Sequence, residues 1–438
     1  MNQTVKSGKT LLVDGPASVK TVSGKVEVFG SVLRNTRKVV IREGKRLPFT
    51  VKETAVFDVS LGENATVEEI HGSTIPSSWT KACEELLNFQ IRPFTVVVLG
   101  TVDSGKTSFC TYLMNKLLKE KKRVAILDGD LGQSDVGPPC TIAYAFATKP
   151  VMDLFDLEAR NAFFVGVTSP SKAIDKVMEG LASLRKEVLT DSPHVIVIDT
   201  DGWVEGEDAI NYKVQLIEQL DPDIIFCIQQ KDELGPLLKT LEKFRRVRVD
   251  SPPVIRKRTR EKRRSLRELG YVKYLINAKV QSIPLNRVKI EADELAGLSM
   301  TRENFRKARK IYDLLGMKPL HFAELQDKVC IVISKRRWID MDTIKRVHEF
   351  TKKKVVVVRK GEEQGLLAAL YDAERKFLGI GVLREIDYRR KVMKVYTPTS
   401  KEVSIVATGR IKLDKDLREI PIFVEEKQRV FRKFEKRS

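Results

Sequence analysis

The chain has 438 residues, with 79 Lys and Arg against 59 Asp and Glu, a formal net charge of +20. Hydrophobic residues make up 42% of the chain, which is enough for packed cores and excludes a chain that is disordered throughout. No apolar run approaches the roughly 20 residues of a spanning helix, and the N-terminus has no apolar signal segment. We therefore expect a cytoplasmic protein with two to four domains that does not insert into a membrane.

The five cysteines form no Cys-x-x-Cys pair, so we expect reduced, mostly buried thiols rather than disulfides or a zinc site. The charge has two interpretations. It indicates either a polyanionic partner, meaning nucleic acid or an anionic membrane surface, or a highly charged solvated surface.

Short β-like runs separated by glycine-containing turns begin the chain. They predict a mostly-β domain over residues 1–88, which ends in a connecting helix at 77–87. The expected strands cover 10–13, 25–29, 39–41, 50–52 and 55–59.

Apolar strands alternate with helical runs from residue 89 to 322. This alternation is typical of an α/β domain in which a parallel sheet is covered by helices on both faces. The expected strands are 94–99, 123–127, 162–167, 194–198 and 223–229, and the helices between them include 107–120, 171–189 and 208–220.

A phosphate-binding pattern lies between the first of these strands and its helix. The residues fit G-x-x-x-x-G-K-[ST], in which Gly100 and Gly105 permit backbone shapes that a Cβ would forbid. Loop N–H groups favour phosphate, Lys106 adds a positive charge, and the Thr107 hydroxyl is placed to hold Mg²⁺. The predicted nucleotide-binding residues are Gly100, Thr101, Val102, Asp103, Ser104, Gly105, Lys106, Thr107 and Ser108.

Two carboxylates, Asp128 and Asp130, follow the second strand. The carboxyl ends of parallel strands face the ligand crevice, so one acid can position the water shell of Mg²⁺ and the other can accept a proton from an attacking hydroxyl. Later strands lead into Thr168-Ser169-Pro170, for which an ordinary loop is the simpler interpretation, and into Asp-Thr-Asp-Gly-Trp203. Trp203 is either a packing residue or an aromatic that stacks on a nucleobase.

Half of the excess charge lies in residues 243–267, which hold twelve Lys or Arg and two acids, a net charge of +10. Residues 256–269 have no Gly or Pro and predict a mobile, anion-facing helix, with a plain solvated face as the alternative.

Strand-like runs return after residue 322 and predict a third, mostly-β domain over 323–438. The chain ends in a basic tail, whose cations are Lys427, Arg429, Arg432, Lys433, Lys436 and Arg437. Basic termini are commonly only solvated, so we give this tail less weight than the 243–267 segment.

The ordered motifs resemble those of the polynucleotide 5′-hydroxyl kinase family of RNA-processing factors, and in particular its archaeal members. These motifs are GTVDSGKTS, DGDLGQSD, GVTSP, IDTDGWVEG and RTREKRRSLRELGYVKYL, and the run FLGIGVLREIDYRRKVMKVYTP resembles the third domain of the family. The resemblance implies ATP- and Mg²⁺-dependent transfer of the γ-phosphate to the 5′-OH end of RNA or DNA, in RNA processing or repair. It also implies protein partners in RNA processing.

The resemblance also implies a role for each matching residue. Lys106 and Thr107 serve ATP and Mg²⁺, Asp130 is favoured as the base, and Asp128 is favoured as a metal-shell ligand, although the two acids could exchange roles. Gln133 matches a family glutamine. The substrate end is held by a clasp at Thr168, Ser169 and Pro170 and by Trp203. The lid over the phosphates, near 256–268, contributes Arg260, Arg263, Arg264 and Arg267, in a register that the motif does not define.

Three departures from the family pattern stand out: Thr101 replaces a common proline, Asp199 replaces a common asparagine, and Ser169 replaces the clasp threonine. Two other functions compete with the kinase. One is a non-catalytic ATP-binding scaffold, against which the paired acids, Trp203 and the lid arginines argue. The other is an ATPase switch, which gives Trp203 no role.

Overall fold

The computed structural model describes the chain except residues 36, 90–92, 256, 292–304 and 421–438. It divides into two compact units, Met1–Arg267 and Glu268–Ser438, and each is described by itself. The predicted basic tail at 427–437 lies outside the described residues. Among the residues described, no helix combines the length and apolar character needed to cross a membrane. All five cysteines are free and buried, as expected.

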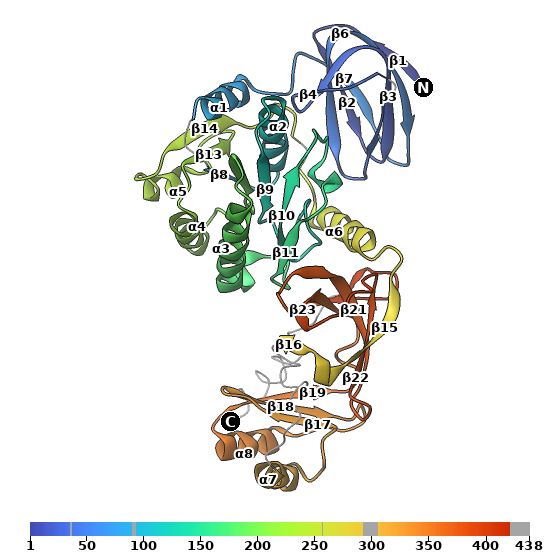
Figure 1. Ribbon diagram of the computed structural model, residues 1–438, viewed down its shortest axis with the longest axis vertical. Coiled ribbons are helices and arrows are strands. Elements are labelled where there is room, and N and C mark those ends of the chain that lie inside the picture. The colour runs from blue at the N-terminus through green and yellow to red at the C-terminus, as the bar shows by residue number, and fades with distance from the viewer. Residues whose placement is uncertain (36, 90–92, 256, 292–304, 421–438) are drawn as a thin grey trace, which may run out of the picture. The chain divides into compact units, whose positions relative to one another are not determined.

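The first unit begins with a seven-stranded antiparallel sheet, which confirms the expected β domain (Figure 1). The longest strand, β6, alternates in burial: Leu47, Phe49 and Val51 are buried, and so are Ala55 and Phe57 further along. The sequence predicted two strands in this stretch, but they form one because the intervening residues continue the pairing with β3 through a register shift. The strands are β1 (Asn2–Val5), β2 (Lys9–Asp14), β3 (Ala17–Val28), β4 (Ser31–Val32), β5 (Lys38–Ile41), β6 (Arg46–Leu61) and β7 (Val67–His71).

The predicted connecting helix forms as α1 (Ser77–Leu87). It leads into a second seven-stranded sheet with the order β11-β10-β9-β12-β8-β13-β14. Its strands are β8 (Phe94–Gly100), β9 (Val124–Asp128), β10 (Thr141–Ala147), β11 (Asn161–Phe164), β12 (Val195–Asp199), β13 (Ile224–Gln229) and β14 (Arg246–Asp250).

Helices cover both faces of this sheet, as the alternating pattern predicted (Figure 1). On one face α3 (Ile174–Thr190), α4 (Glu207–Leu220) and α5 (Gly235–Thr240) share a core with the sheet. On the other face α2 (Lys106–Lys119) packs with α1, and the ring of Phe109 meets Phe226 of β13 edge-on at 5.3 Å.

The sheet is mixed rather than wholly parallel. Strands β9, β12, β8, β13 and β14 are parallel, but β10 runs antiparallel to both β9 and β11. Strand β10 was not predicted because its alanines lack the β-branched side chains typical of strands. Strand β14 was not predicted because the alternation in Arg-Val-Arg-Val-Asp was interpreted only as charge.

The second unit contains a sheet in the order β15-β22-β21-β20-β23-β16, with β24 on β23, and a three-stranded sheet β17-β18-β19. Strands β15 and β16 pair with C-terminal strands, so this division differs from the domain boundary predicted at 322. Sequence patterns identify strands but not their partners. The strands are β15 (Lys279–Pro284), β16 (Lys289–Glu291), β17 (His321–Glu324), β18 (Lys328–Ile333), β19 (Lys354–Arg359), β20 (Leu366–Tyr371), β21 (Phe377–Asp387), β22 (Val392–Thr397), β23 (Ile405–Leu413) and β24 (Glu419–Ile420).

The small sheet is packed on both faces. Along β18, Val329, Ile331 and Ile333 face a core shared with α7 (Phe305–Leu315) and α8 (Met341–Thr351), whereas Val332 joins the core of the larger sheet. The alternation of β18 therefore couples the two sheets of this unit.

Candidate active site

The P-loop turns from β8 into α2 with two residues at positive φ, Asp103 at 60° and Gly105 at 101°. A Cβ on Gly100 would lie 2.5 Å from Ser104 Oγ and 2.9 Å from the backbone carbonyl oxygen of Ile228, so this close approach requires glycine. The Lys106 ammonium donates hydrogen bonds to the carbonyls of Gly100 (3.1 Å) and Thr101 (2.8 Å). The lysine is therefore buried against the loop that its motif assigns to phosphate.

Asp199 ends β12, which pairs with both β8 and β9. Its Oδ2 accepts a 2.6 Å hydrogen bond from Thr107 Oγ1, while its Oδ1 is buried with no hydrogen-bond partner among the described residues. Burial raises the pKa of Asp199 to about 6, although the charge of Lys106 and the Thr107 hydrogen bond oppose that rise. Asp199 was expected in the turn after this strand and as a departure from the family pattern, but it was given no metal role. Its place at the end of a buried strand was the available indication.

Asp128 ends β9, and its carboxyl group is held by the loop that follows rather than facing the open crevice. Its Oδ2 accepts hydrogen bonds from Ser134 Oγ and from the N–H groups of Asp135 and Val136, at 2.7 to 3.1 Å. Its Oδ1 accepts the N–H of Asp130 at 3.0 Å. Burial, and next the nearby Asp199 charge, raise the pKa of Asp128 well above its usual value. Because these oxygens already accept four hydrogen bonds, the carboxyl fits loop support better than the predicted role in the metal shell.

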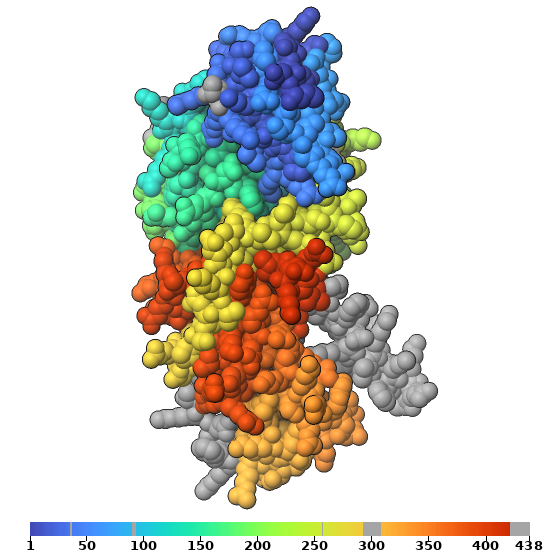
Figure 2. Space-filling view, turned by 90° about the vertical axis from the view of Figure 1, so that its right-hand side faces the viewer, coloured from blue at the N-terminus to red at the C-terminus, as the bar shows by residue number. Residues whose placement is uncertain are grey.

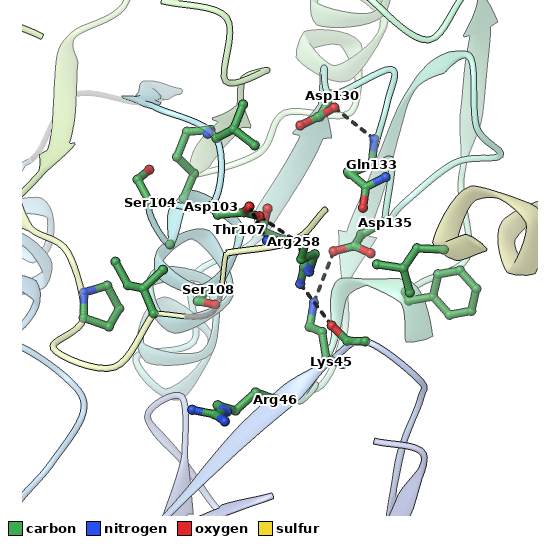
Figure 3. A pocket seen from close by; sticks show the side chains of 18 of the residues that line it. Lys45, Arg46, Asp103, Ser104, Thr107, Ser108, Asp130, Gln133, Asp135 and Arg258 are labelled. Atoms are coloured by element: carbon green, nitrogen blue, oxygen red, sulfur yellow. Dashed lines mark hydrogen bonds and ion pairs between the residues drawn. The ribbon is translucent and has the colours of Figure 1, made fainter. Parts of the chain in front are cut away.

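Asp130 faces the pocket, unlike Asp128 (Figure 3). Its Oδ1 accepts the N–H groups of Gly132 (2.9 Å) and Gln133 (3.0 Å), and no hydrogen bond from the described residues reaches its Oδ2. Burial raises its pKa, although Lys106 opposes the rise. The side chain of Gln133 donates to the carbonyl of Arg263 at 3.1 Å and thereby connects this loop to the basic segment.

The N-terminal sheet contributes cations that the sequence analysis did not single out. Arg42 and Lys45, from the turn between β5 and β6, form ion pairs with Asp135 and Asp153 of the central domain. The pairs join residues 90 to 111 positions apart in the chain, so no local pattern could reveal them. Figure 2 shows the surfaces of these two parts of the first unit in contact.

The N-terminal sheet and the central domain enclose a pocket above the P-loop, and Figure 3 shows their side chains converging on it. The N-terminal sheet supplies apolar and basic walls, the P-loop and the 130–135 turn supply polar groups, and residues 252–267 supply a further wall. The site thus has the P-loop as its floor and mainly apolar walls next to it, which suits a nucleotide. Wall residues include Leu12, Phe29, Arg42, Pro48, Phe155, Val254 and Ile255.

The predicted lid forms a helix, α6 (Arg260–Tyr274), and the arginines that lead into it and lie along it reach the P-loop. Asp103 pairs with Arg263 at 3.1 Å and with Arg258 at 3.6 Å, and Arg258 also donates to the carbonyl of Gly44 at 3.2 Å. Arg258, which the sequence analysis did not choose, lines the pocket together with Arg267. Arg260 is exposed, and neither it nor Arg264 lines the pocket.

The predicted clasp lies beside the same loops but not in the pocket lining. A Cβ on Gly202 would lie 2.6 Å from Val102 N, and one on Gly132 would lie 2.9 Å from the carbonyl oxygen of Thr168. The Ser169 hydroxyl lies 2.9 Å from that of Ser171, and Pro170 begins a short 3₁₀ turn. The 168–170 clasp therefore borders the Asp130 turn, and the turn that carries Trp203 borders the P-loop.

Trp203 is half-buried and stacks on Tyr212, with ring centroids 5.6 Å apart and planes at 23°. Beneath it the Asp201 carboxylate accepts hydrogen bonds from the Trp203 N–H and the Tyr212 hydroxyl, both at 2.9 Å, and pairs with fully buried Lys213 at 2.8 Å. Burial lowers the pKa of Lys213, although Asp201 opposes the fall. One face of the indole is thus used in packing, and a buried ion pair supports its turn.

The sheet, the loop from β8 to α2 and the Thr107–Asp199 contact define a P-loop nucleotide-binding protein. The family model described as the mRNA cleavage and polyadenylation factor CLP1 P-loop matches residues 100–277.

Relatives and a solved structure extend this match beyond the P-loop. A polyribonucleotide 5′-hydroxyl-kinase of Pyrococcus furiosus is 30% identical over 355 residues, covering 80% of this chain and 96% of the relative. One of Methanocaldococcus jannaschii is 27% identical over 363 residues, covering 82% and 97% respectively. The wild-type Clp1p–Pcf11p complex contains a chain of the same fold, with TM-score 0.65 and 14% identity over 94% of this chain and 97% of that one. The chain belongs to the polyribonucleotide 5′-hydroxyl-kinase family, which confirms the resemblance seen in its motifs.

Proposed function

We propose that this protein is an ATP-dependent kinase that transfers the γ-phosphate of ATP to the 5′-hydroxyl end of RNA. The main support for this proposal is that Lys106, Thr107 and Asp130 line one pocket, in a chain whose relatives are named for this activity. In this proposal the P-loop holds the ATP phosphates, and the nucleoside lies against the walls supplied by the N-terminal sheet.

Lys106 must exchange partners when nucleotide binds. In the structure its ammonium is satisfied by the Gly100 and Thr101 carbonyls, so the β- and γ-phosphates would take over those hydrogen bonds. Lys106 then offsets the charge that spreads over the transferring oxygens.

Asp130 is the proposed base. Two backbone N–H groups hold its Oδ1, which leaves Oδ2 to accept the proton of the attacking 5′-hydroxyl. Its raised pKa makes the carboxylate a better proton acceptor than an exposed aspartate. Gln133 would keep this loop against the lid through its hydrogen bond to Arg263.

The residues present fit a Mg²⁺ ion. Hard oxygen donors suit it, and Asp199 offers a buried, unpartnered Oδ1 beside the Thr107 hydroxyl. No cluster of three carboxylate, histidine or cysteine ligands occurs among the described residues, which agrees with an ion that takes its remaining ligands from phosphates and water. Thr107 and Asp199 are therefore the proposed holders, in place of Asp128. The bound ion would neutralise charge on the β- and γ-phosphates.

The lid arginines complete the proposed site. Arg258, Arg263 and Arg267 lie next to the P-loop or in the pocket wall, and Asp103 now neutralises two of them. Nucleotide phosphates would compete with Asp103 for these guanidinium groups. Trp203 and the 168–170 turn would border the substrate end, because they adjoin the P-loop and the Asp130 turn.

One assay tests the proposal directly. The protein is incubated with γ-labelled ATP, Mg²⁺ and a 5′-hydroxyl oligonucleotide, and a 5′-phosphorylated oligonucleotide of the same sequence serves as control. Label on the 5′-hydroxyl RNA alone is the expected result. Release of free phosphate without labelled RNA would indicate an ATPase switch. The absence of both labelled RNA and free phosphate would indicate a non-catalytic scaffold. A parallel DNA oligonucleotide measures the preference between the two sugars.

A further inference from the structure

A loop of the second unit carries a strongly exposed tryptophan among cations. Trp338 lies between β18 and α8, and 74% of its surface is exposed. Lys335, Arg336 and Arg337 precede it and are all exposed. The next residue, Ile339, packs against the core formed with α7 and α8. The loop is thus anchored beside the indole while the indole itself stays outside, so packing does not explain this tryptophan.

One face of the indole is already held by a cation. The guanidinium carbon of Arg359, at the end of β19, lies 4.0 Å from the ring centroid of Trp338. Arg359 is fixed in turn by Glu362, whose Oε1 accepts its Nε–H at 2.9 Å. The ring is therefore supported from one side by a positioned cation–π contact, and its large exposed fraction leaves the other face open.

A further exposed cation follows Arg359 in the chain, and a second basic segment lies in the turn from β21 to β22. Lys360 follows Arg359 and is tied to β18 by a 2.8 Å hydrogen bond from its N–H to the carbonyl of Ile333. The turn from β21 to β22 exposes Arg389, Arg390 and Lys391. Hydrogen bonds from the N–H groups of Arg390 and Arg389, and then the charges of Arg390 and Lys360, lower the pKa of Asp387 in this turn. The Gly365 N–H donates to the Leu383 carbonyl at 2.7 Å, which holds the turn after Lys360 against β21, the strand that leads into the second basic segment.

Four acids in or beside these segments already have partners, among them Asp387, whose Oδ2 lies 3.9 Å from Arg390 Nε. Asp340 caps α8 by accepting the Thr343 N–H at 2.7 Å, and Glu362 is paired with Arg359. Glu363 is buried and accepts the Gly361 N–H at 2.7 Å. We name residues 335–338, 359–360 and 387–391 the Trp338 patch. Its surface combines an open aromatic face with excess positive charge.

We propose that the Trp338 patch binds single-stranded RNA, with a base stacked on the open face of Trp338 and the adjacent phosphates on the cations of the patch. Every base presents a π-face, so such a platform accepts RNA of any sequence, while the cations follow the backbone. An acidic peptide would use the cations but would leave the supported indole face without a role. The patch lies in the unit that lacks the P-loop, so this binding goes beyond the proposed phosphoryl transfer.

The test uses the full chain and an RNA of about 20 nucleotides whose 5′ end carries a fluorophore, so that it cannot act as a kinase substrate. Fluorescence anisotropy measures its affinity. Trp338→Ala should weaken binding about tenfold, and Trp338→Phe should retain most of the affinity because it keeps a stacking face. Lys360→Gln should weaken binding and lower the slope of log affinity against log salt by about 0.7, the effect of one lost phosphate contact.

Lys415→Gln is the matched control, because it removes an exposed cation of the same unit outside the patch and should leave affinity unchanged. Phosphorylation of a 5′-hydroxyl dinucleotide should be the same in wild type and Trp338→Ala, which separates this proposal from the kinase proposal. Equal affinity of wild type and Trp338→Ala, or equal losses in Lys360→Gln and Lys415→Gln, would overturn the proposal. So would binding of a labelled acidic peptide that depends on Trp338 when RNA binding does not.

Discussion

The hydroxyl of Thr107 and the carboxylate of Asp199 are joined by a 2.6 Å hydrogen bond that links the first turn of α2 to the end of β12. The second oxygen of Asp199 is buried without a partner among the described residues, so one acceptor oxygen of this carboxylate is unused. Burying an unsatisfied carboxylate oxygen is unfavourable, which makes a cation at this position stabilising. The metal site proposed here depends on this relationship.

Asp199→Asn should weaken the Mg²⁺-dependent part of ATP binding. The amide keeps an acceptor for Thr107 but removes the charge. We therefore expect the Mg²⁺ concentration that gives half of the Mg²⁺-dependent increase in ATP affinity to rise about tenfold. Titration of Mg²⁺ into the protein with a fluorescent ATP analogue measures this without any turnover.

Asp128→Asn provides the contrast. An amide cannot accept hydrogen bonds at both ends, so the 128–136 loop should lose about 1–3 kcal/mol of stability while Mg²⁺ dependence stays near that of wild type. The reverse pattern, with Mg²⁺ binding lost in Asp128→Asn and kept in Asp199→Asn, would return the metal role to Asp128.

Asp130→Asn should abolish phosphoryl transfer while leaving ATP affinity largely intact. The Asn side-chain oxygen can still accept the N–H groups of Gly132 and Gln133, so the turn should keep its shape, but the group can no longer take a proton. Single-turnover transfer to a 5′-hydroxyl RNA should fall at least about 100-fold. A variant that transfers at the wild-type rate would exclude Asp130 as the base.

The sequence predicted the P-loop and the order of the loops around it because these features are local. The run before Gly100 is wholly buried, and the helix begins at Lys106, so strand, turn and helix each follow from adjacent residues. The register of the lid was beyond prediction: Arg258 lines the pocket and Arg260 does not, a difference decided by contacts with Gly44 and Asp103.

Contacts between residues far apart in the chain were also beyond prediction from the sequence. Nothing near Arg42 in the sequence indicates Asp153, 111 residues away, and nothing near β15 indicates β22 as its neighbour. Such pairings arise from tertiary packing, which hydrophobic periodicity does not encode. The Asp199–Thr107 contact was predictable only in part. The end of the strand at Asp199 follows from local sequence, but the order of strands that brings it beside Thr107 does not.

Lys213→Met should destabilise the protein strongly. It leaves the Asp201 carboxylate buried without its 2.8 Å partner, and loss of one member of a buried ion pair costs about 3–5 kcal/mol. Urea unfolding measures the change. Lys243→Met is the matched control, because its pair with Glu218 is exposed and should contribute less than about 1 kcal/mol. Equal effects of the two substitutions would show that burial does not set the strength of the Asp201 pair.

Asp153→Asn should destabilise the contact between the N-terminal sheet and the central domain in a pH-dependent way. Burial alone would raise the pKa of Asp153, but the charges of Lys45 and Arg42 and their hydrogen bonds lower it well below the usual value. A carboxylate with a lowered folded-state pKa contributes its full stability above the unfolded pKa of about 3.9, and that contribution is lost as the pH falls further.

The difference in unfolding free energy between wild type and Asp153→Asn should therefore be about 3 kcal/mol near neutral pH and should shrink below about pH 4. Urea unfolding at several pH values between about 7 and 3 measures it. Asp58→Asn is the control, because the Asp58 side chain is half exposed and its one ion pair among the described residues is with the N-terminal amine, at 3.6 Å. That variant should match wild type throughout. A difference for Asp153→Asn that stays constant down to about pH 3 would show that lost packing, rather than the charge of Asp153, weakens the contact.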